Sequence, residues 1–328
     1  MSSRTRWGVL LAFAALLGAG LAGYSVQSRC EYHSAAFTSM GTAACVSLHT
    51  GRENFSNALK AVMAEFRLVT EIADLHSEKS ELSRLNRSAA AAPFVCSPEL
   101  WEILTESRRA YKLSGGAFDI SVKPLMTLWG FYRKRSQVPD AAEIAKVREL
   151  TGLDKVIFDD KKHTVKFSRP GMALDLGGIA KGYALERAAR ALIRMGITRG
   201  VIDLGGNLRL LPELPPGRVA YRIGIRRPMR KNGGVIPEIL QLQGNLAVSS
   251  SGDYERYVKL GGKYYGHIID PVTGIPAPRD YAATAIAPDA ACSDWLSTAV
   301  FLRGETMAAR LKRMLPGTDF IIVKKDGE

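Results

Sequence analysis

The sequence predicts an α+β fold, in which strands and helices are mixed rather than regularly alternating. Segments with the two-residue period of strands stand beside segments with the 3.6-residue period of helices, and no βαβ repeat runs along the chain. In the second half, short apolar runs are separated by turn-forming glycines and prolines. With 328 residues, the chain is long enough to bury a sizeable core.

The first half of the chain begins, after its N-terminal segment, with a predicted strand at 37–49 that Met40, Gly41 and Thr42 interrupt. The spacing of apolar and polar residues then predicts an amphipathic helix at 54–72, a charged segment at 77–86, a helix at 98–112 that Gly115 and Gly116 end, an irregular aromatic loop at 124–135, a short helix at 139–150 and a hairpin at 155–167.

The second half opens on a strand-to-helix turn. The elements expected there are the end of a strand at 172–176, a helix at 179–195, a strand at 200–211, a Pro-rich loop at 211–217, a strand at 221–225, a basic loop at 226–234, a Ser-rich turn at 249–254, a helix at 293–314 and a strand at 320–323. The tetrapeptide Asp-Leu-Gly-Gly occurs at 175–178 and again at 203–206, but no longer repeat surrounds it.

The net charge narrows the classes of partner. Lys and Arg number 45 against 32 Asp and Glu, giving a formal charge of +13, which suits an anionic ligand, an acidic partner or a membrane surface. The basic residues are dispersed, and the sequence has no helix-turn-helix, zinc-finger or RNA-binding signature. We therefore expect no nucleic-acid partner.

The N-terminal 29 residues have the pattern of an export leader. Arg4 and Arg6 precede an apolar run at 9–22, which is short for a membrane span, and small residues follow it. We expect a signal peptide or an N-terminal membrane anchor at 1–29, one domain at 30–328 and a periplasmic location. Tyr24 stands where a bacterial lipoprotein would have its lipidated cysteine.

The four cysteines do not form a recognisable site. Cys30, Cys45, Cys96 and Cys292 stand far apart without a CxxC pair, which argues against a zinc site and a thioredoxin-type redox site. We expect buried free thiols, although export would allow a disulfide whose pairing the spacing does not fix.

The run LDLGGIAKGYALERA at 174–188 has the features of an anion site. Two glycines allow a tight turn between strand and helix, and Lys181 falls in the first helical turn, where a cation is unfavourable unless an anion binds there too. Asp175 adds an oxygen acceptor. The run lacks the Walker spacing, so it does not indicate a nucleoside triphosphatase. The alternative is a glycine-rich turn with a solvated lysine.

Three further residues are candidates for chemistry. Asp294 and Thr298 are four residues apart on a predicted helix, so their oxygens share one face and would suit Mg²⁺. The alternative is that Asp294 caps the helix, although Asp289 competes for that position. His267 ends a strand before the turn at 271–274; it would act as a general base or phosphate donor, or as a structural residue bonding a carbonyl.

Taken in order, these segments resemble the ApbE family of FAD:protein FMN transferases. The resemblance covers nearly all of the chain after the leader. It rests on Met40-Gly41-Thr42, SELSRLN at 80–86, Gly-Ala-Phe-Asp at 116–119, the run at 174–188, residues 201–207, 221–228 and 250–257, HIIDPVTG at 267–274 and the segment from Asp294 to Thr298.

The resemblance implies an ApbE-like, T-fold-related arrangement of mixed, mainly antiparallel sheets packed with helices. It implies that FMN is transferred from FAD to a Thr or Ser hydroxyl of an acceptor redox protein as a phosphoester, releasing AMP, with Mg²⁺. The residues that would contact FAD are Met40, His76, Ala117, Phe118, Asp119, Asp175, Lys181, His267 and Ile268. Asp294, Thr298 and the carbonyl of Gly178 would hold Mg²⁺, and His267 and Asp294 would be catalytic.

Two alternative functions stay open. One is a Mg²⁺-dependent FAD pyrophosphatase that yields FMN and AMP, and the other is a non-catalytic flavin-binding assembly protein. The chain departs from the family where Leu75-His76 replaces a usual tyrosine, where Gly178 replaces a common alanine and where Trp295 replaces a small residue. The imidazole of His76 can still stack on a flavin, a carbonyl ligand does not depend on the side chain at 178, and Trp295 would point away from Asp294 and Thr298.

Overall fold

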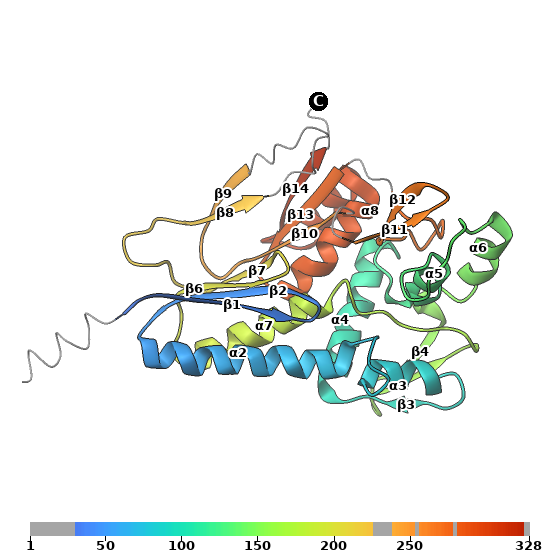
Figure 1. The fold of residues 1–328 in the computed structure, drawn as a ribbon, viewed down its shortest axis with the longest axis horizontal. Helices are drawn as coiled ribbons and strands as arrows, with labels where there is room; N and C mark the ends of the chain where they lie inside the picture. Colours follow the sequence, from blue (N-terminus) through green and yellow to red (C-terminus); the bar gives the residue numbers. More distant parts are fainter. Residues whose placement is uncertain (1–29, 226–237, 253–255, 278–280, 325–328) are drawn as a thin grey trace, which may run out of the picture.

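A seven-stranded antiparallel sheet forms the centre of the molecule (Figure 1). The computed structural model describes residues 30–225, 238–252, 256–277 and 281–324. The strands of this sheet, in spatial order, are β1 (Glu31–Ser39), β2 (Thr42–Thr50), β6 (Gly200–Leu204), β7 (Asn207–Leu210), β10 (Ala247–Ser251), β13 (Tyr281–Ala287) and β14 (Asp319–Lys324). Every neighbouring pair is antiparallel, in agreement with the mainly antiparallel sheets that the family resemblance implies.

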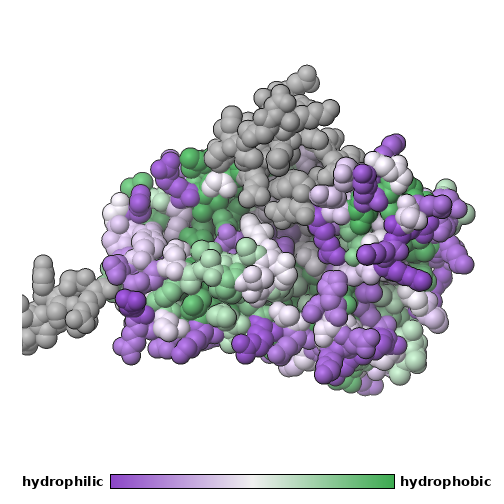
Figure 2. All heavy atoms as spheres, in the orientation of Figure 1, coloured by the Kyte–Doolittle hydropathy of each residue, from purple (hydrophilic) through white to green (hydrophobic). Residues whose placement is uncertain are grey.

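Three long helices cover one face of the sheet. They are α2 (Arg52–Ala73), α7 (Ala180–Arg194) and α8 (Ala290–Met314), and they pack on one another as well as on the strands. Alternation along β6 directs Ile202 and Leu204 into this main core. Figure 2 shows hydrophilic residues along the lower edge, where α2 lies, so this helix is amphipathic as its sequence predicts.

A two-stranded hairpin covers the opposite face. Strands β8 (Tyr221–Ile225) and β9 (Glu238–Leu242) pair with each other and bury Tyr221, Ile223 and Ile225 against Val248 of the sheet. The predicted strand at 221–225 is therefore confirmed. The basic loop expected at 226–234 lies outside the described residues.

A second group of elements flanks the helical side. The helices are α3 (Glu81–Ser88), α4 (Pro98–Ser114), α5 (Lys123–Leu128) and α6 (Ala141–Arg148), with short 3₁₀ turns η1 (Ile120–Val122) and η2 (Leu153–Lys155). The strands are β3 (Phe94–Val95), β4 (Val156–Asp159) and β5 (Thr164–Phe167), which form one small sheet, and the hairpin β11 (Tyr257–Leu260) and β12 (Lys263–Gly266). Figure 1 places α5, α6 and this hairpin at the end away from the start of β1.

The hairpin turns explain two differences from the predicted strands. Met40 and Gly41 both have positive φ angles, so the predicted interruption is a turn between β1 and β2. Gly205 and Gly206 also have positive φ angles, and the single strand predicted at 200–211 is wrong because they divide it into β6 and β7. In the second Asp-Leu-Gly-Gly, the two glycines form the turn of the hairpin between β6 and β7.

Other predicted elements differ for local reasons. The extended segment at 172–176 is not a strand, because the side-chain amide of Asn86, and not a neighbouring strand, bonds both backbone groups of Leu174, at 2.7 and 2.9 Å. The Ser-rich turn expected at 249–254 is instead β10 as far as Ser251. The aromatic loop expected at 124–135 contains α5, and the charged segment at 77–86 begins α3, which the side chain of Ser80 caps.

The remaining predictions for the second half are confirmed, including the helix after 179 and the final strand. The helix predicted at 293–314 begins earlier, at Ala290, because Asp289 caps it. The four cysteines are all free, but only Cys96 and Cys292 are buried, so the expectation of buried thiols is wrong for the exposed Cys30 and the partly exposed Cys45. No helix in the described part of the chain is long and apolar enough to cross a membrane.

Candidate active site

A cavity of about 980 Å³ opens between the edge of the sheet, the starts of α7 and α8 and the group of elements around α5. Its size suits a dinucleotide-sized ligand. Every site residue predicted from the sequence lines it: Met40, His76, Ala117, Phe118, Asp119, Asp175, Gly178, Lys181, His267, Ile268, Asp294 and Thr298. The fold thus brings together residues up to 258 positions apart in the chain (298 minus 40).

Two tight turns form the sheet-side wall. Met40 and Gly41 lie between β1 and β2, and Gly205 follows β6. A Cβ on Gly205 would lie 2.7 Å from the hydroxyl oxygen of Thr42, so only glycine allows the two turns to approach this closely. Gly205 is therefore required for two reasons: its positive φ angle and its close contact with Thr42.

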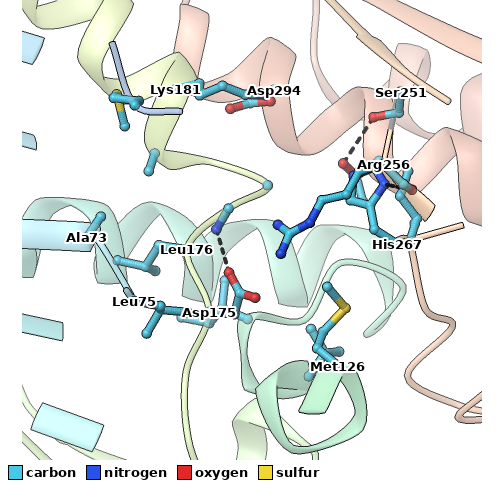
Figure 3. A pocket seen from close by; sticks show the side chains of 18 of the residues that line it. Ala73, Leu75, Met126, Asp175, Leu176, Lys181, Ser251, Arg256, His267 and Asp294 are labelled. Atoms are coloured by element: carbon cyan, nitrogen blue, oxygen red, sulfur yellow. Dashed lines mark hydrogen bonds between the residues drawn. The ribbon is translucent and has the colours of Figure 1, made fainter. Parts of the chain in front are cut away.

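The first Asp-Leu-Gly-Gly leads into α7 and places Asp175 inside the cavity (Figure 3). One carboxylate oxygen of Asp175 accepts a hydrogen bond from the amide of Gly177 at 2.8 Å, and the other accepts one from the hydroxyl of Tyr132 at 2.6 Å. Burial and the negative charge of Asp175 together raise the pKa of Tyr132 well above its usual range. Tyr132 therefore stays protonated and acts as a donor that orients Asp175.

Asp294 lies at the start of α7, although it belongs to α8. Its Oδ2 accepts a hydrogen bond from the amide of Gly182 at 2.9 Å, and its Oδ1 accepts one from the side-chain amide of Asn207, also at 2.9 Å. Since Ile179 has no side-chain cap to offer α7, Asp294 supplies an acceptor from the neighbouring helix. The amide of Gly182 lies in the first turn of α7, so this bond satisfies one of the donors that the helix leaves unpaired.

The side of Gly182 facing α8 has no room for a side chain. A Cβ on this glycine would lie 2.2 Å from the carbonyl oxygen of Ala290 and 2.7 Å from the Cβ of Asp294. Gly182 therefore permits the close packing of α7 on α8 that brings its amide to Asp294. Sequence analysis did not identify Gly182 or Asn207, although both stand in the segments that carry the family resemblance.

The predicted metal ligands lie next to one another. A Cβ built on Gly178 would be 3.7 Å from the hydroxyl oxygen of Thr298, and Thr298 lies one helical turn after Asp294. Among the residues that the structure describes, no three His, Cys, Asp or Glu side chains form a metal-binding group. The predicted ligands are instead one carboxylate, one hydroxyl and one carbonyl, all oxygens, and such a sparse set would suit Mg²⁺ that also binds phosphates.

His267 lines the cavity from the segment that directly follows β12. Its ring Nδ1 is 3.2 Å from the carbonyl oxygen of Arg256, and its own amide donates to the same oxygen at 3.2 Å. Burial, with the positive charges of Arg256 and Lys181, lowers the pKa of His267 to about 4. With Nδ1 bonded to the carbonyl, Nε2 of the neutral ring is the acceptor. The ring therefore makes the bond to a backbone carbonyl that was considered from sequence, and the role of general base or phosphate donor stays a prediction.

Arg256 is a cavity residue that sequence analysis missed. Its guanidinium lies 5.5 Å from the centre of the Tyr132 ring and points into the cavity toward Asp175 (Figure 3). Arg256 and Lys181 are cationic groups on different walls of the same cavity, an arrangement that favours an anionic ligand. The position of Arg256 beside aromatic side chains could not be predicted from the sequence, because Tyr132 is more than 120 positions away.

Two predicted contact residues also have local structural roles. Asp119 is buried and accepts hydrogen bonds from the amide and hydroxyl of Ser121, at 2.8 and 2.7 Å, which begins η1. Burial raises the pKa of Asp119 above its usual range, against the effect of these hydrogen bonds. The ring of His76 lies beside that of Tyr132, with 5.9 Å between the ring centres, so two aromatic rings lie next to each other at this edge of the cavity.

Two serines of β10 join this strand to α8 through pairs of hydroxyl groups. Ser249 pairs with Ser293 at 2.8 Å, and Ser251 pairs with Ser297 at 2.8 Å and Thr298 at 3.2 Å. Trp295 is fully buried and donates from its indole to Glu106 at 2.8 Å, away from Asp294 and Thr298 as expected.

Comparison with known proteins agrees with this geometry. The sequence model of the ApbE family matches residues 40–322. An FAD:protein FMN transferase of Treponema pallidum is 31% identical over 340 aligned positions, covering 99% of this chain and 93% of that protein. An FAD:protein FMN transferase of Haemophilus influenzae is 30% identical over 257 positions, covering 76% of this chain and 74% of that protein.

Solved structures show the same fold. The flavin transferase ApbE from Vibrio cholerae superposes with a TM-score of 0.79 at 26% identity, covering 90% of this chain and 94% of that one. The ApbE protein of Thermotoga maritima superposes with a TM-score of 0.81 at 30% identity, covering 91% and 96%. In sequence and in fold, the chain belongs to the ApbE family.

Proposed function

We propose that the chain is an FAD:protein FMN transferase, which moves FMN from FAD to a Thr or Ser hydroxyl of an acceptor protein and releases AMP. The observation that carries the proposal is the grouping of Asp294, Thr298 and Gly178 with Lys181 and His267 in one cavity of dinucleotide size. The curated relatives bearing this name support it.

The reaction exchanges the phosphoanhydride bond of FAD for a phosphoester bond to the acceptor. The acceptor oxygen forms a bond to the phosphorus of the FMN half, the bond from that phosphorus to the AMP oxygen breaks, and the hydroxyl proton passes to a base. The oxygens of Asp294, Thr298 and Gly178 would hold Mg²⁺, which would supply positive charge to the pyrophosphate. Phosphoryl transfer needs mainly alignment and charge stabilisation, so the protein requires few reacting groups.

The residues of the cavity have separate tasks in this proposal. Lys181, at the start of α7, and Arg256 would bind the pyrophosphate oxygens, and the α7 amides would add to their effect. His267 would accept the proton of the acceptor hydroxyl through Nε2, for which its lowered pKa keeps the ring neutral. Met40, His76, Phe118 and Ile268 would provide the surfaces against which FAD packs.

We also propose that the segment at 1–29 directs export or anchors the protein, placing the enzyme and its acceptor redox protein on the periplasmic side of the membrane. The basis is the sequence pattern of two arginines followed by the apolar run at 9–22. Detection of the protein in a periplasmic or membrane fraction would support this location, whereas recovery only with a cytoplasmic marker would contradict it.

The transfer is tested by incubating the protein with FAD, Mg²⁺ and a redox subunit purified without its covalent FMN. The expected result is a mass increase of the acceptor by one FMN group and the appearance of AMP. Free FMN and AMP without an adduct would instead identify an FAD pyrophosphatase. Binding of FAD without either product would identify a non-catalytic flavin-binding protein.

A further inference from the structure

The segment 267–277 forms the cavity wall that carries His267 and Ile268. It is a tight loop whose two arms pair, since the amide of Ala277 donates to the carbonyl of Ile268 at 2.8 Å and the amide of Asp270 donates to the carbonyl of Ile275 at 2.9 Å. The indole of Trp129, on the α5 side, donates to the carbonyl of Gly274 at 2.7 Å. One side of this loop is therefore attached to the elements around α5.

An ion pair attaches the other side of the loop to α8. Nη1 of Arg303 donates to Oδ2 of Asp270 at 2.9 Å, and Nη2 donates to Oδ1 at 2.8 Å. The two side chains are 29% and 19% exposed, so the pair is largely shielded from solvent. Asp270 also accepts the amide of Val272 at 2.9 Å, which couples the ion pair to the shape of the turn.

Arg303 lies on the helix that carries the proposed metal ligands. It stands nine residues after Asp294 and five after Thr298, and Gly304 directly after it leaves helical geometry, with φ 65°. The guanidinium also donates to the carbonyl of Leu302 at 3.1 Å, beside this kink. Arg303 therefore satisfies a backbone acceptor at the break in α8 and holds the loop at the same time.

A bidentate pair fixes orientation as well as distance, because the planar guanidinium matches both carboxylate oxygens. His267 is three residues before Asp270. The phosphate near which His267 would act would be held by residues of α8. We propose that Arg303 and Asp270 are positioning residues that set His267 against the phosphate held at Asp294 and Thr298. This inference rests on the proposed transferase function.

The pair is tested by replacing each partner with a neutral residue of similar size. Arg303→Met removes both charged hydrogen bonds, whereas Asp270→Asn keeps an oxygen acceptor for the amide of Val272 and removes the ion pair. Arg313→Met, an exposed arginine of the same helix, is the matched control. For each variant, we would measure kcat for adduct formation, the Kd of FAD by flavin fluorescence and the melting temperature.

A positioning role predicts that Arg303→Met and Asp270→Asn each lower kcat about tenfold or more, because misplacement of reacting groups costs rate. The Kd of FAD should change less than about threefold, since the FAD contacts are on several other walls. Arg303→Lys should recover part of kcat, and the double variant should be no slower than the slower single one. A wild-type kcat in Arg303→Met and Asp270→Asn would overturn the inference. So would a double variant in which the two losses of kcat multiply.

Failure of the proposed function is distinguishable from failure of this inference. A wild-type protein that forms no adduct contradicts the transferase proposal by itself. Hydrogen exchange of peptides covering 267–277 then still reports on the ion pair, because the loop should exchange faster in Arg303→Met than in Arg313→Met. Equal exchange in the two variants would overturn the claim that Arg303 holds the loop.

Discussion

Asp294 combines a structural and a proposed catalytic task in one carboxylate. Its two oxygens accept from Gly182 and Asn207, so the side chain is held in a single orientation at the start of α7. A carboxylate oxygen has more than one lone pair, so each oxygen can still contact a cation. The alternative foreseen from sequence, capping of α8, is wrong because Asp289 has that position.

Replacing Asp294 by alanine should lower the rate of FMN transfer about a hundredfold or more, because the charge that stabilises the metal and the transition state is lost. The measurement is the initial rate of adduct formation over a range of Mg²⁺ concentrations. Glu305→Ala, which removes an exposed carboxylate from the same helix, should transfer at the wild-type rate. Unchanged turnover and Mg²⁺ dependence in Asp294→Ala would reject the metal assignment.

His267 gives a prediction about pH. Its pKa is lowered from 6.5 to about 4, so the ring is already neutral throughout the range in which an ordinary histidine titrates. The profile of kcat/KM for FAD should therefore lack a histidine inflection between about pH 5.5 and 7.5 and should fall only as the pH approaches the lowered value. An inflection near 6.5 that disappears in His267→Gln would show that the ring titrates normally.

The packing of α7 against α8 is the contact between elements on which the site depends most. Both helices begin at the cavity, and Gly182 lets them approach closely enough for the amide to reach Asp294. Neighbouring β7 adds Asn207 from the sheet. The site is thus assembled where two helices and a strand meet, and shifting any of the three would move the carboxylate.

Gly182→Ala should destabilise the protein by about 1–3 kcal/mol, because the added methyl group overlaps the carbonyl of Ala290 and forces the helices apart. The measurement is the denaturant midpoint by circular dichroism. Gly51→Ser is the control, since a Cβ at Gly51 meets nothing within 4 Å and its φ of −70° is ordinary. A midpoint for Gly182→Ala equal to that of the control would contradict the packing requirement.

Prediction of the elements succeeded where the signal is local. Apolar spacing gave α2, α4, α7 and α8 to within a few residues, because each helix buries one face of its own sequence. It also gave α6, although none of its residues is fully buried. It failed for 172–176, whose extended backbone is satisfied by the distant side chain of Asn86, and for α5, a single short helix inside an aromatic segment. A bond to a distant side chain leaves no periodic pattern in the sequence, and a helix as short as α5 is too short to show one.

The whole molecule brings together a site that no single segment encodes. Motifs at Asp175, His267 and Asp294 indicated chemistry separately, and the antiparallel sheet with its covering helices places them around one cavity. The resemblance to a family located these residues, but it did not identify Arg256, Gly182, Asn207 or the pair of Arg303 and Asp270. Those residues act through contacts across the fold, which sequence spacing does not reveal.

The most direct test of FMN transfer by this cavity is the ratio of AMP released to acceptor adduct formed, followed over time with FAD and Mg²⁺. Each transfer breaks one pyrophosphate bond and forms one phosphoester, so the wild-type protein should give the two products in equal amounts, with no free FMN. AMP accumulating in excess of the adduct, with matching free FMN, would contradict transfer and identify hydrolysis as the activity of the site.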